Sequence, residues 1–393
     1  MSEKYFEQLK NLVSHLPKSK ILAGQSKSNG QYKFYLSGKK IGKIDVATTN
    51  QDAIIMGDGG TASIAFAKGK YSYSSHNFGF YSSAEYLTTE YIFRTIEQFL
   101  PVLNYKGFVG SGIKNIDKKF LFDLYIEKLP LPEQKKIASI LTSVDEVIET
   151  TQKQIDKLQD LKKATMNELL TKGIGHTEFK NSELGRIPKS WEVKDLASVS
   201  PEKGIQTGPF GSQLHAHEYT TDGVPLVMPK DMNPPLIDIS NIARIPEHRA
   251  IDLSKHRVKK GDILFSRRGD IGRFALMNAS SDGWVCGTGC LRVRLKNELV
   301  HPFFVAQYLT KDEPKEWLNL NAVGLTMLNL STSILEGLPL IVPPMKEQMM
   351  IVSALQSIDA RLSKCHDYLS QTQALKKSLM QDLLTGKVRV QVN

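Results

Sequence analysis

Apolar residues recur at helical spacing in two long stretches of the chain, at intervals that alternate mostly between four and three residues. Such a rhythm predicts a helix with an apolar seam along one side. Pro132 stands where a first helical residue is expected, Thr151 interrupts the first seam, and Gly173 and Gly386 suit the helix ends. We predict two helices of about 40 residues, each about 60 Å long. The seam residues are Ile137, Leu141, Val144, Ile148, Ile155, Leu158 and Leu161, then Ile351, Leu355, Ile358, Leu362, Leu369 and Leu375.

The two stretches are copies of each other. An offset of 214 residues aligns Glu133 with Glu347 and continues without a gap to Thr171 and Thr385, with 15 of these 39 positions identical. A long helix cannot bury an apolar seam alone, so we predict that the copies pair. If the two copies are related by a pseudo-two-fold axis that crosses the helices, the axis reverses the chain direction, and the pair is an antiparallel coiled coil. A generic helical hairpin or a dimerisation arm remains an alternative that periodicity does not exclude.

The duplication continues upstream of both helices. Further upstream, residues 52–60 resemble residues 262–270 at an offset of 210, which matches the turn around Asp58 with the turn around Arg268. The difference between the two offsets indicates loops of unequal length. Nearer the helices, the offset of 214 matches Gly110 with Gly324, Asn115 with Asn329 and Ile116 with Leu330.

The chain is therefore organised as globule, helix, globule, helix. The globules mix strand-like and helix-like runs, which predicts an α+β protein with two mixed α/β domains. The strand-like runs are 54–56, 64–67, 225–228, 263–266 and 274–277, and the helix-like runs are 88–100 and 302–309. The predicted boundaries are 1–130 for the first domain, 131–173 for the first helix, 174–190 for a polar linker, 191–342 for the second domain, and 343–393 for the second helix with its tail.

Charge and cysteine content narrow the function. The net charge of +10 over 393 residues favours nucleic acid or an anionic membrane as a partner. No apolar run is long enough to cross a bilayer and residues 1–10 carry no apolar signal core, so we expect a cytoplasmic protein. Three cysteines argue against a disulfide framework, and Cys286 and Cys290 lack a second ligand pair at zinc-site spacing, so no metal site is expected.

The tandem order, with Glu-Gln following a proline at each helix start and Leu-Leu-Thr at each end, resembles the specificity subunits of type I restriction-modification enzymes. The resemblance covers essentially the whole chain. Three further segments support it: 203–214, 260–269 and Leu338-Pro-Leu. The first globule has no clear counterpart of Gln206-Thr-Gly-Pro-Phe-Gly, and we expect residues 27–32 to take that place.

The resemblance implies a DNA-reading subunit without catalytic residues or a cofactor of its own. Each globule would be a target-recognition domain that reads one half of a split site in double-stranded DNA. The helices would space the halves and dock two methyltransferase subunits, which motor-nuclease subunits join; S-adenosylmethionine, ATP and Mg²⁺ are expected on those partners. The helix residues assigned to pairing and docking are Ile137, Leu141, Val144, Ile148, Ile351, Leu355, Ile358 and Leu362.

Basic and amide side chains are the candidates for DNA contact, because lysine suits phosphate and the arginine fork suits guanine. Basic residues also gather from His256 to Lys260. Arg267 and Arg268 follow an apolar strand, which predicts a projecting turn in which one of them reads a base; an internal salt bridge to Asp270 is the alternative. The full candidate set is Lys27, Asn29, Lys68, Lys70, Gln206, Thr207, Gln213, Lys230, Arg267, Arg268, Arg273 and Thr326.

Two rival functions are weaker. A stand-alone adenine methyltransferase is suggested by Phe108-Val-Gly-Ser-Gly and Asn233-Pro-Pro-Leu, but Leu236 cannot stack on a flipped base and Gly110 belongs to the duplication. A coiled-coil scaffold without DNA contact explains the helices but leaves the basic duplicated globules unexplained.

Overall fold

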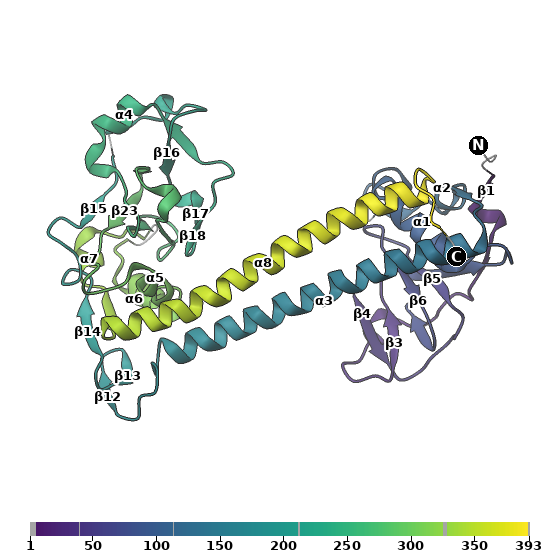
Figure 1. Ribbon diagram of the computed structural model, residues 1–393, viewed down its shortest axis with the longest axis horizontal. Helices are drawn as coiled ribbons and strands as arrows, with labels where there is room; N and C mark the ends of the chain where they lie inside the picture. The colour runs from purple at the N-terminus through teal and green to yellow at the C-terminus, as the bar shows by residue number, and fades with distance from the viewer. Residues whose placement is uncertain (1–4, 39, 113, 211–212, 325–327, 392–393) are drawn as a thin grey trace. The chain divides into compact units, whose positions relative to one another are not determined.

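The computed structural model describes residues 5–38, 40–112, 114–210, 213–324 and 328–391 (Figure 1). The chain divides into two compact units, one formed by residues 1–155 with 365–393 and the other by residues 156–364. Each unit contains one globular domain and a part of each long helix, α3 (Leu131–Leu169) and α8 (Met345–Leu384).

The first domain is built on a four-stranded antiparallel sheet in the order β2-β8-β5-β6. Helix α1 (Thr89–Val102) covers one face, where Ile54, Met56 and Phe80 join its buried residues Tyr91 and Ile92 in one core. The opposite face packs against a three-stranded sheet, β4-β3-β7. The strands are β2 (Val13–His15), β3 (Tyr32–Tyr35), β4 (Ile41–Ile44), β5 (Ala53–Gly57), β6 (Ile64–Ala67), β7 (Tyr71–Tyr73) and β8 (Asn77–Ser82).

Smaller elements complete this domain. β1 (Phe6–Gln8) pairs with β11 (Tyr125–Glu127), and β9 (Phe108–Val109) pairs with β10 (Asn115–Ile116). The helical turns are η1 (Leu9–Asn11), η2 (Ala23–Gln25), η3 (Leu103–Gly107) and α2 (Lys118–Phe122).

The second domain repeats this topology. Its four-stranded sheet has the order β15-β23-β20-β21, its three-stranded sheet has the order β19-β16-β22, and α5 (Pro302–Tyr308) takes the place of α1. In both three-stranded sheets the central strand pairs antiparallel with one neighbour and parallel with the other. The strands are β15 (Ile205–Thr207), β16 (Val224–Val227), β19 (Ala243–Ile245), β20 (Ile263–Ser266), β21 (Phe274–Leu276), β22 (Val285–Cys286) and β23 (Cys290–Val293).

The remaining elements of the second unit are short. Residues within the segment predicted as a linker form a hairpin of β12 (Phe179–Ser182) and β13 (Gly185–Pro188). β14 (Glu192–Asp195) pairs with β24 (Pro339–Val342), and β17 (Met232–Asn233) pairs with β18 (Leu236–Ile237). The helical segments are η5 (Ala216–Glu218), η6 (Pro229–Asp231), α4 (Glu247–Asp252), η7 (Ser254–His256), η8 (Ala279–Ser281), α6 (Asp312–Asn321) and α7 (Thr332–Glu336).

Backbone hydrogen bonds correct the predicted match between the domains. The Asp58 N–H donates to the His76 carbonyl and the Asp58 carbonyl accepts from Ile116, both at 2.9 Å; Arg267 makes the same two bonds with Gly289 and Leu330 at 2.8 Å. Asp58 therefore corresponds to Arg267, an offset of 209, so the predicted offset of 210 was wrong by one residue. The sequences of the two segments are similar enough to align one residue out of register. In the structure, a one-residue shift would turn every strand side chain to the other face of the sheet.

The counterpart of Gln206-Thr-Gly-Pro also differs from the prediction. Edge strand β2 pairs with β8 as β15 pairs with β23, with Ser14 opposite Tyr81 and Gln206 opposite Arg292. The segment from Lys27 instead matches the one from Thr220, because the Lys27 N–H donates to Lys43 O at 2.8 Å as the Thr220 N–H donates to Arg244 O at 2.9 Å. The prediction for residues 27–32 was wrong, because a short polar motif does not define which strand it joins.

The two long helices run antiparallel within each unit, as predicted. In the first unit Asp145 pairs with Lys376 and Glu133 with Arg389, each at 2.6 Å. In the second unit Lys162 pairs with Asp359 at 2.6 Å. These aspartates, and these lysines, are equivalent residues of the duplication, so the copied helices form the same ion pair twice.

The start of each long helix is fixed by the same buried glutamine. The side-chain amide of Gln134 accepts from Thr88 N at 2.8 Å and donates to the carbonyls of Tyr86 and Leu129. Gln348 accepts from His301 N at 2.8 Å and donates to the carbonyls of Leu299 and Pro343. Both side chains are fully buried. These equivalent contacts give the physical reason for the glutamine of the Glu-Gln signature.

The helix seam follows the prediction only in part. Ile137, Leu141, Ile351 and Leu355 are fully buried in the cores of their own domains, and Val144, Ile148, Ile358 and Leu362 are half-buried. Leu161 and Leu375 are 51% and 53% exposed, so their assignment to the seam was wrong. The step of three residues from Leu158 to Leu161 advances only about 300° around the helix and turns Leu161 outward.

Candidate nucleic-acid interface

Four segments of the second domain meet at one edge of the four-stranded sheet and form a loop cluster. Antiparallel pairing brings the end of β20 beside the start of β23, so that the Arg267 N–H donates to the Gly289 carbonyl at 2.8 Å. The backbone of Arg268 bridges to Asn329, and the Arg273 guanidinium donates to the Pro229 carbonyl at 3.4 Å. The cluster thus comprises the β20–β21 turn, the loop before β23, η6, and residues 328–330.

The three arginines of the β20–β21 turn have different surroundings. The Asp270 carboxylate binds Arg273 at 3.2 Å, so the salt bridge considered for Arg267 or Arg268 is made by Arg273 instead. Arg267 is half-buried, and its Nε has no hydrogen-bond partner among the described residues. Arg268 is exposed, as is Lys230 in η6. This places Arg268 and Lys230 at the surface of the loop cluster, with Arg273 bound within it.

The amide candidates of the second domain have partners inside it. The Gln206 side-chain oxygen accepts from Arg292 Nη2 at 2.9 Å. The Gln213 side-chain oxygen accepts from Phe210 N at 3.2 Å, and the backbone carbonyl of Gln213 accepts from the Arg249 guanidinium. Thr207 is half-buried at the end of β15, and Thr326 lies outside the described residues.

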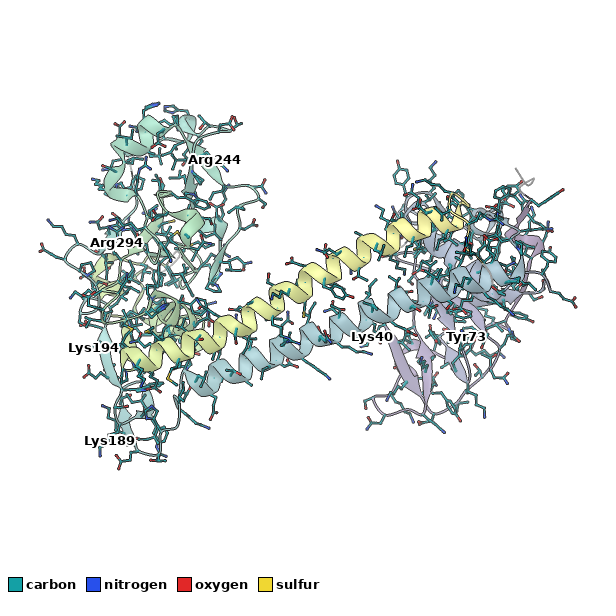
Figure 2. The ribbon with its side chains drawn as sticks, in the orientation of Figure 1. Lys40, Tyr73, Lys189, Lys194, Arg244 and Arg294 are labelled. Carbon is teal, nitrogen blue, oxygen red and sulfur yellow. The ribbon has the colours of Figure 1, made fainter. Side chains whose placement is uncertain are left out.

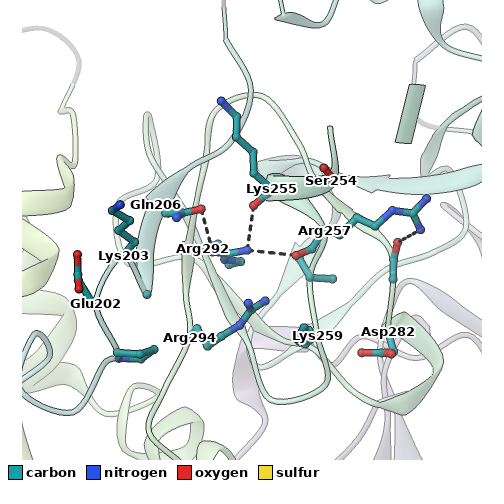
Figure 3. Close-up of a pocket in the computed structure, with 14 residues that line it drawn as sticks. Glu202, Lys203, Gln206, Ser254, Lys255, Arg257, Lys259, Asp282, Arg292 and Arg294 are labelled. Carbon is teal, nitrogen blue, oxygen red and sulfur yellow. Dashed lines mark hydrogen bonds between the residues drawn. The ribbon is translucent and has the colours of Figure 1, made fainter. Parts of the chain in front are cut away.

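The side of β15 that carries Gln206 opens into a concave basin of about 580 Å³ (Figure 3). Four segments line it: 201–206, 254–259, 282–283 and 292–294. We call it the Arg292 basin. Its basic side chains are Lys203, Lys255, Arg257, Lys259, Arg292 and Arg294, and its acidic ones are Glu202 and Asp282. The predicted cluster from His256 to Lys260 contributes to this wall.

Arg292 lies in the middle of the basin and is 6% exposed (Figure 3). Besides Gln206, it donates to the backbone carbonyls of Lys255 and Arg257 at 3.1 and 3.2 Å. Burial and the nearby Arg294 lower the pKa of Arg292. Arg294 itself makes a two-pronged contact with Asp262, at 2.8 and 2.7 Å, which raises its pKa. Sequence reasoning missed Arg292 and Arg294, because alternation along a strand does not show which side chain borders a basin.

The first-domain candidates are not gathered at the matching edge. Lys68 and Lys70 follow the end of β6, which lies at the opposite end of β5 from the turn at Asp58. Lys68 pairs with Glu90 at 3.1 Å, Lys27 pairs with Asp45 at 2.5 Å, and Asn29 and Lys70 are exposed.

The edge that matches the loop cluster carries a residue that sequence reasoning overlooked. Lys118, at the start of α2, lies 3.2 Å from Asp58 and over the Phe78 ring. Where the second domain presents Arg267, the first domain therefore presents an acidic residue with its own lysine partner.

Comparisons with known proteins define the class of this fold. A family described as "Type I restriction modification DNA specificity domain" matches residues 6–160 and 219–368, so the chain belongs to this family. It is 28% identical over 359 residues to the type I restriction enzyme MjaVIII specificity subunit of Methanocaldococcus jannaschii, which covers 89% of this chain and 82% of that one. It is 20% identical to the EcoDI specificity subunit of Escherichia coli, over 95% of this chain and 85% of that one.

Solved structures agree on the fold. A type I restriction-modification S subunit from M. genitalium matches with a TM-score of 0.67 at 16% identity, covering 97% of this chain and 96% of that one. The predicted fold class and family are confirmed. The chain is a DNA sequence-recognition subunit rather than a catalytic one, and no comparison supports the alternative of a stand-alone methyltransferase.

In the described part of the chain, no group of three or more His, Cys, Asp or Glu side chains could hold a metal ion. No helix among those residues is both long and apolar enough to cross a membrane.

Proposed function

We propose that each domain reads one half of a bipartite DNA site and that the paired helices set the spacing between the halves. The observation that carries this proposal is the contrast between scaffold and edge. The two domains share strand order, strand register and helix start, but at equivalent backbone positions the loop edge has Arg267 and Arg268 in one domain and Asp58 and Gly59 in the other. A common scaffold suits the repeating phosphate backbone, and different edge residues suit different base sequences.

The partners follow from the same duplication. Two equivalent helix starts, at Gln134 and Gln348, support the docking of two copies of one methyltransferase subunit, with motor-nuclease subunits joining them. S-adenosylmethionine, ATP and Mg²⁺ would be bound by those subunits. A protein that acts with them on DNA is expected in the cytoplasm.

The test is adenine methylation mapped across DNA treated with the full complex. We expect methylation at a site with two defined elements separated by a spacer of constant length. Exchanging residues 191–342 for the equivalent domain of another specificity subunit should change one element only. A change in both elements, or methylation at a continuous site, would contradict the proposal.

A further inference from the structure

We propose that the Arg292 basin binds a phosphodiester group of the DNA backbone, so that the second domain holds DNA through a phosphate site that the first domain lacks. The proposal rests on the DNA-reading function given above and adds a ligand group for a site outside the loop cluster.

The hydrogen bonds of the Arg292 guanidinium go to neutral groups rather than to a carboxylate. Its described hydrogen bonds go to three neutral oxygens, those of Gln206, Lys255 and Arg257 (Figure 3). The nearby Asp262 carboxylate binds Arg294 with both oxygens. Among the described residues, no carboxylate forms an ion pair with Arg292. Burying a cation without an anion is unfavourable, and a phosphate bound in the basin would supply the missing negative charge.

The rim of the basin provides further free cations. Lys203, Lys255 and Lys259 are exposed, and within the described part of the chain none of them forms an ion pair. Lys203 has a φ of 58°, and it is the one described residue other than glycine with a positive φ. A left-handed backbone is unfavourable for a residue with a Cβ, so the backbone alone would favour glycine here. We therefore infer that residue 203 is a lysine because of its charged side chain, which lines the basin.

The arginines and lysines of the basin are not repeated at the equivalent described positions of the first domain. Ser83 N donates to Leu12 O as Arg294 N donates to Gly204 O, and Leu12 N donates to Leu9 O as Gly204 N donates to Pro201 O. These bonds and the strand register define the equivalent positions. The first domain has Tyr81, Ser83, Ser14 and Asn11 where the second has Arg292, Arg294, Gln206 and Lys203.

This asymmetry favours DNA over a protein partner as the occupant. Two copies of one methyltransferase subunit would meet equivalent surfaces on the two halves, whereas Arg292, Arg294 and Lys203 have uncharged residues at their described equivalents in the first domain. The basin also adjoins the loop cluster, because Gln206 at its wall is followed by Thr207 at the sheet edge. A DNA strand has a phosphate at every nucleotide. A strand bound at the loop cluster would therefore have a phosphate close to the adjoining basin.

The experiment measures DNA affinity against KCl concentration for the full chain in its complex with methyltransferase subunits. The variants are Arg292→Gln, Lys203→Gly and Lys255→Gln, tested on a duplex with the native site and on a duplex with both half-sites scrambled. A phosphate contact contributes about 0.9 to the slope of log affinity against log salt. We expect each variant to lower that slope by about this amount, and to weaken binding to both duplexes by the same factor.

Two controls separate the contact from folding and from net charge. Lys203→Gly relieves the positive φ, so its unfolding temperature should be unchanged or higher while its DNA affinity falls. Lys189→Gln removes a lysine at the lower end of the second unit in Figure 2, away from Arg294, where Lys189 pairs with Glu178, and should leave the slope unchanged.

Several outcomes would overturn the proposal. These are an unchanged slope in all three variants, a loss confined to one base position of the half-site, or impaired assembly with the methyltransferase subunits at normal DNA affinity. Calorimetric titration with inorganic phosphate addresses the source of the anion: micromolar binding with unaltered DNA slopes would assign the basin to a free anion. If the unmodified complex does not distinguish native from scrambled half-sites, the proposed function fails instead, and that result is read before any variant is made.

Discussion

Single residues differ between the two domains at equivalent backbone positions of the loop edge. Arg267 occupies the position of Asp58, and Arg268 that of Gly59, with the same backbone bonds on both sides. The backbone hydrogen bonds therefore do not depend on which side chain occupies these positions, so the residue there can differ between domains that read different DNA sequences. Asp270 binds Arg273 and leaves Arg267 and Arg268 without a carboxylate partner in the described part of the turn.

The first prediction concerns these two arginines. At least one of Arg267→Ala and Arg268→Ala should relax a single base position of the second half-site, because a bidentate contact to guanine discriminates by about 1–3 kcal/mol. Binding is measured against every base substitution in that half-site. Arg186→Ala, which removes an exposed arginine on the β12–β13 hairpin, serves as the control. Uniform weakening in both variants would assign the turn to phosphate and contradict base reading.

The second prediction concerns pH. His301 caps α5, its Nδ1 accepting from Phe303 N at 3.2 Å, and burial followed by Lys260 lowers its pKa from the usual 6.5. The folded state therefore binds this proton less readily than the unfolded state, so the contribution to stability is present above pH 6.5 and is lost as the pH falls below it. His301→Asn keeps an acceptor at the cap and should flatten the fall in unfolding temperature between about pH 7 and pH 5.

The matched control for this pH prediction is His217→Asn, at an exposed position. It should keep the pH dependence of the unmodified chain. An equally steep fall in the His301 variant would show that other groups cause it.

At the scale of elements, the duplicated helices make the same ion pair in different surroundings. In the first unit Asp145 and Lys376 share contacts with Arg94 and Glu97, and Arg94 is only 5% exposed. In the second unit Lys162 and Asp359 form a pair of similar exposure, with no further ion pair to either residue among the described residues. A pair within a network of ion pairs should matter more than an isolated pair.

The third prediction follows from this difference. Lys376→Met leaves two partly buried carboxylates with fewer partners and should lower the free energy of unfolding by about 1–3 kcal/mol. Lys162→Met should change it by less than about 1 kcal/mol. Chemical denaturation of the two variants compares equivalent residues in one chain, so equal effects would show that the surrounding network contributes nothing.

At the scale of the whole molecule, the two long helices are the elements whose length can set the spacing of the half-sites. An insertion just after Gly173 would disturb the bond from Ile174 N to Glu347, at 2.9 Å, so the helices themselves are the better place to change the length. Asp145–Lys376 and Lys162–Asp359 share one register, which shows where matched insertions belong.

The fourth prediction is made by inserting one heptad after Gln152 and one after Tyr368, which lengthens both helices by about 10 Å without changing the faces that pair. The spacer length in the methylated site should change while the bases of both elements stay the same. Methylation mapping reads both quantities in one experiment. Altered bases within an element would contradict a purely geometric role for the helices.

The amino-acid sequence alone determined the features that repeat or follow a local period. The duplication at an offset of 214 residues predicted two paired antiparallel helices, and the order of motifs predicted the family. These signals are local, because helical spacing and helix starts such as Glu133-Gln134 are visible within a few turns of chain.

Only the tertiary structure decided which distant residues share a site. It shifted the match between the domains by one residue, because strand register depends on pairing across the sheet rather than on similarity along it. It bound Asp270 to Arg273, turned Leu161 outward, and placed the buried Arg292 beside Lys203 and Lys255. Such neighbours come from segments that are dozens of residues apart, so no pattern along the chain reveals that they surround a single basin.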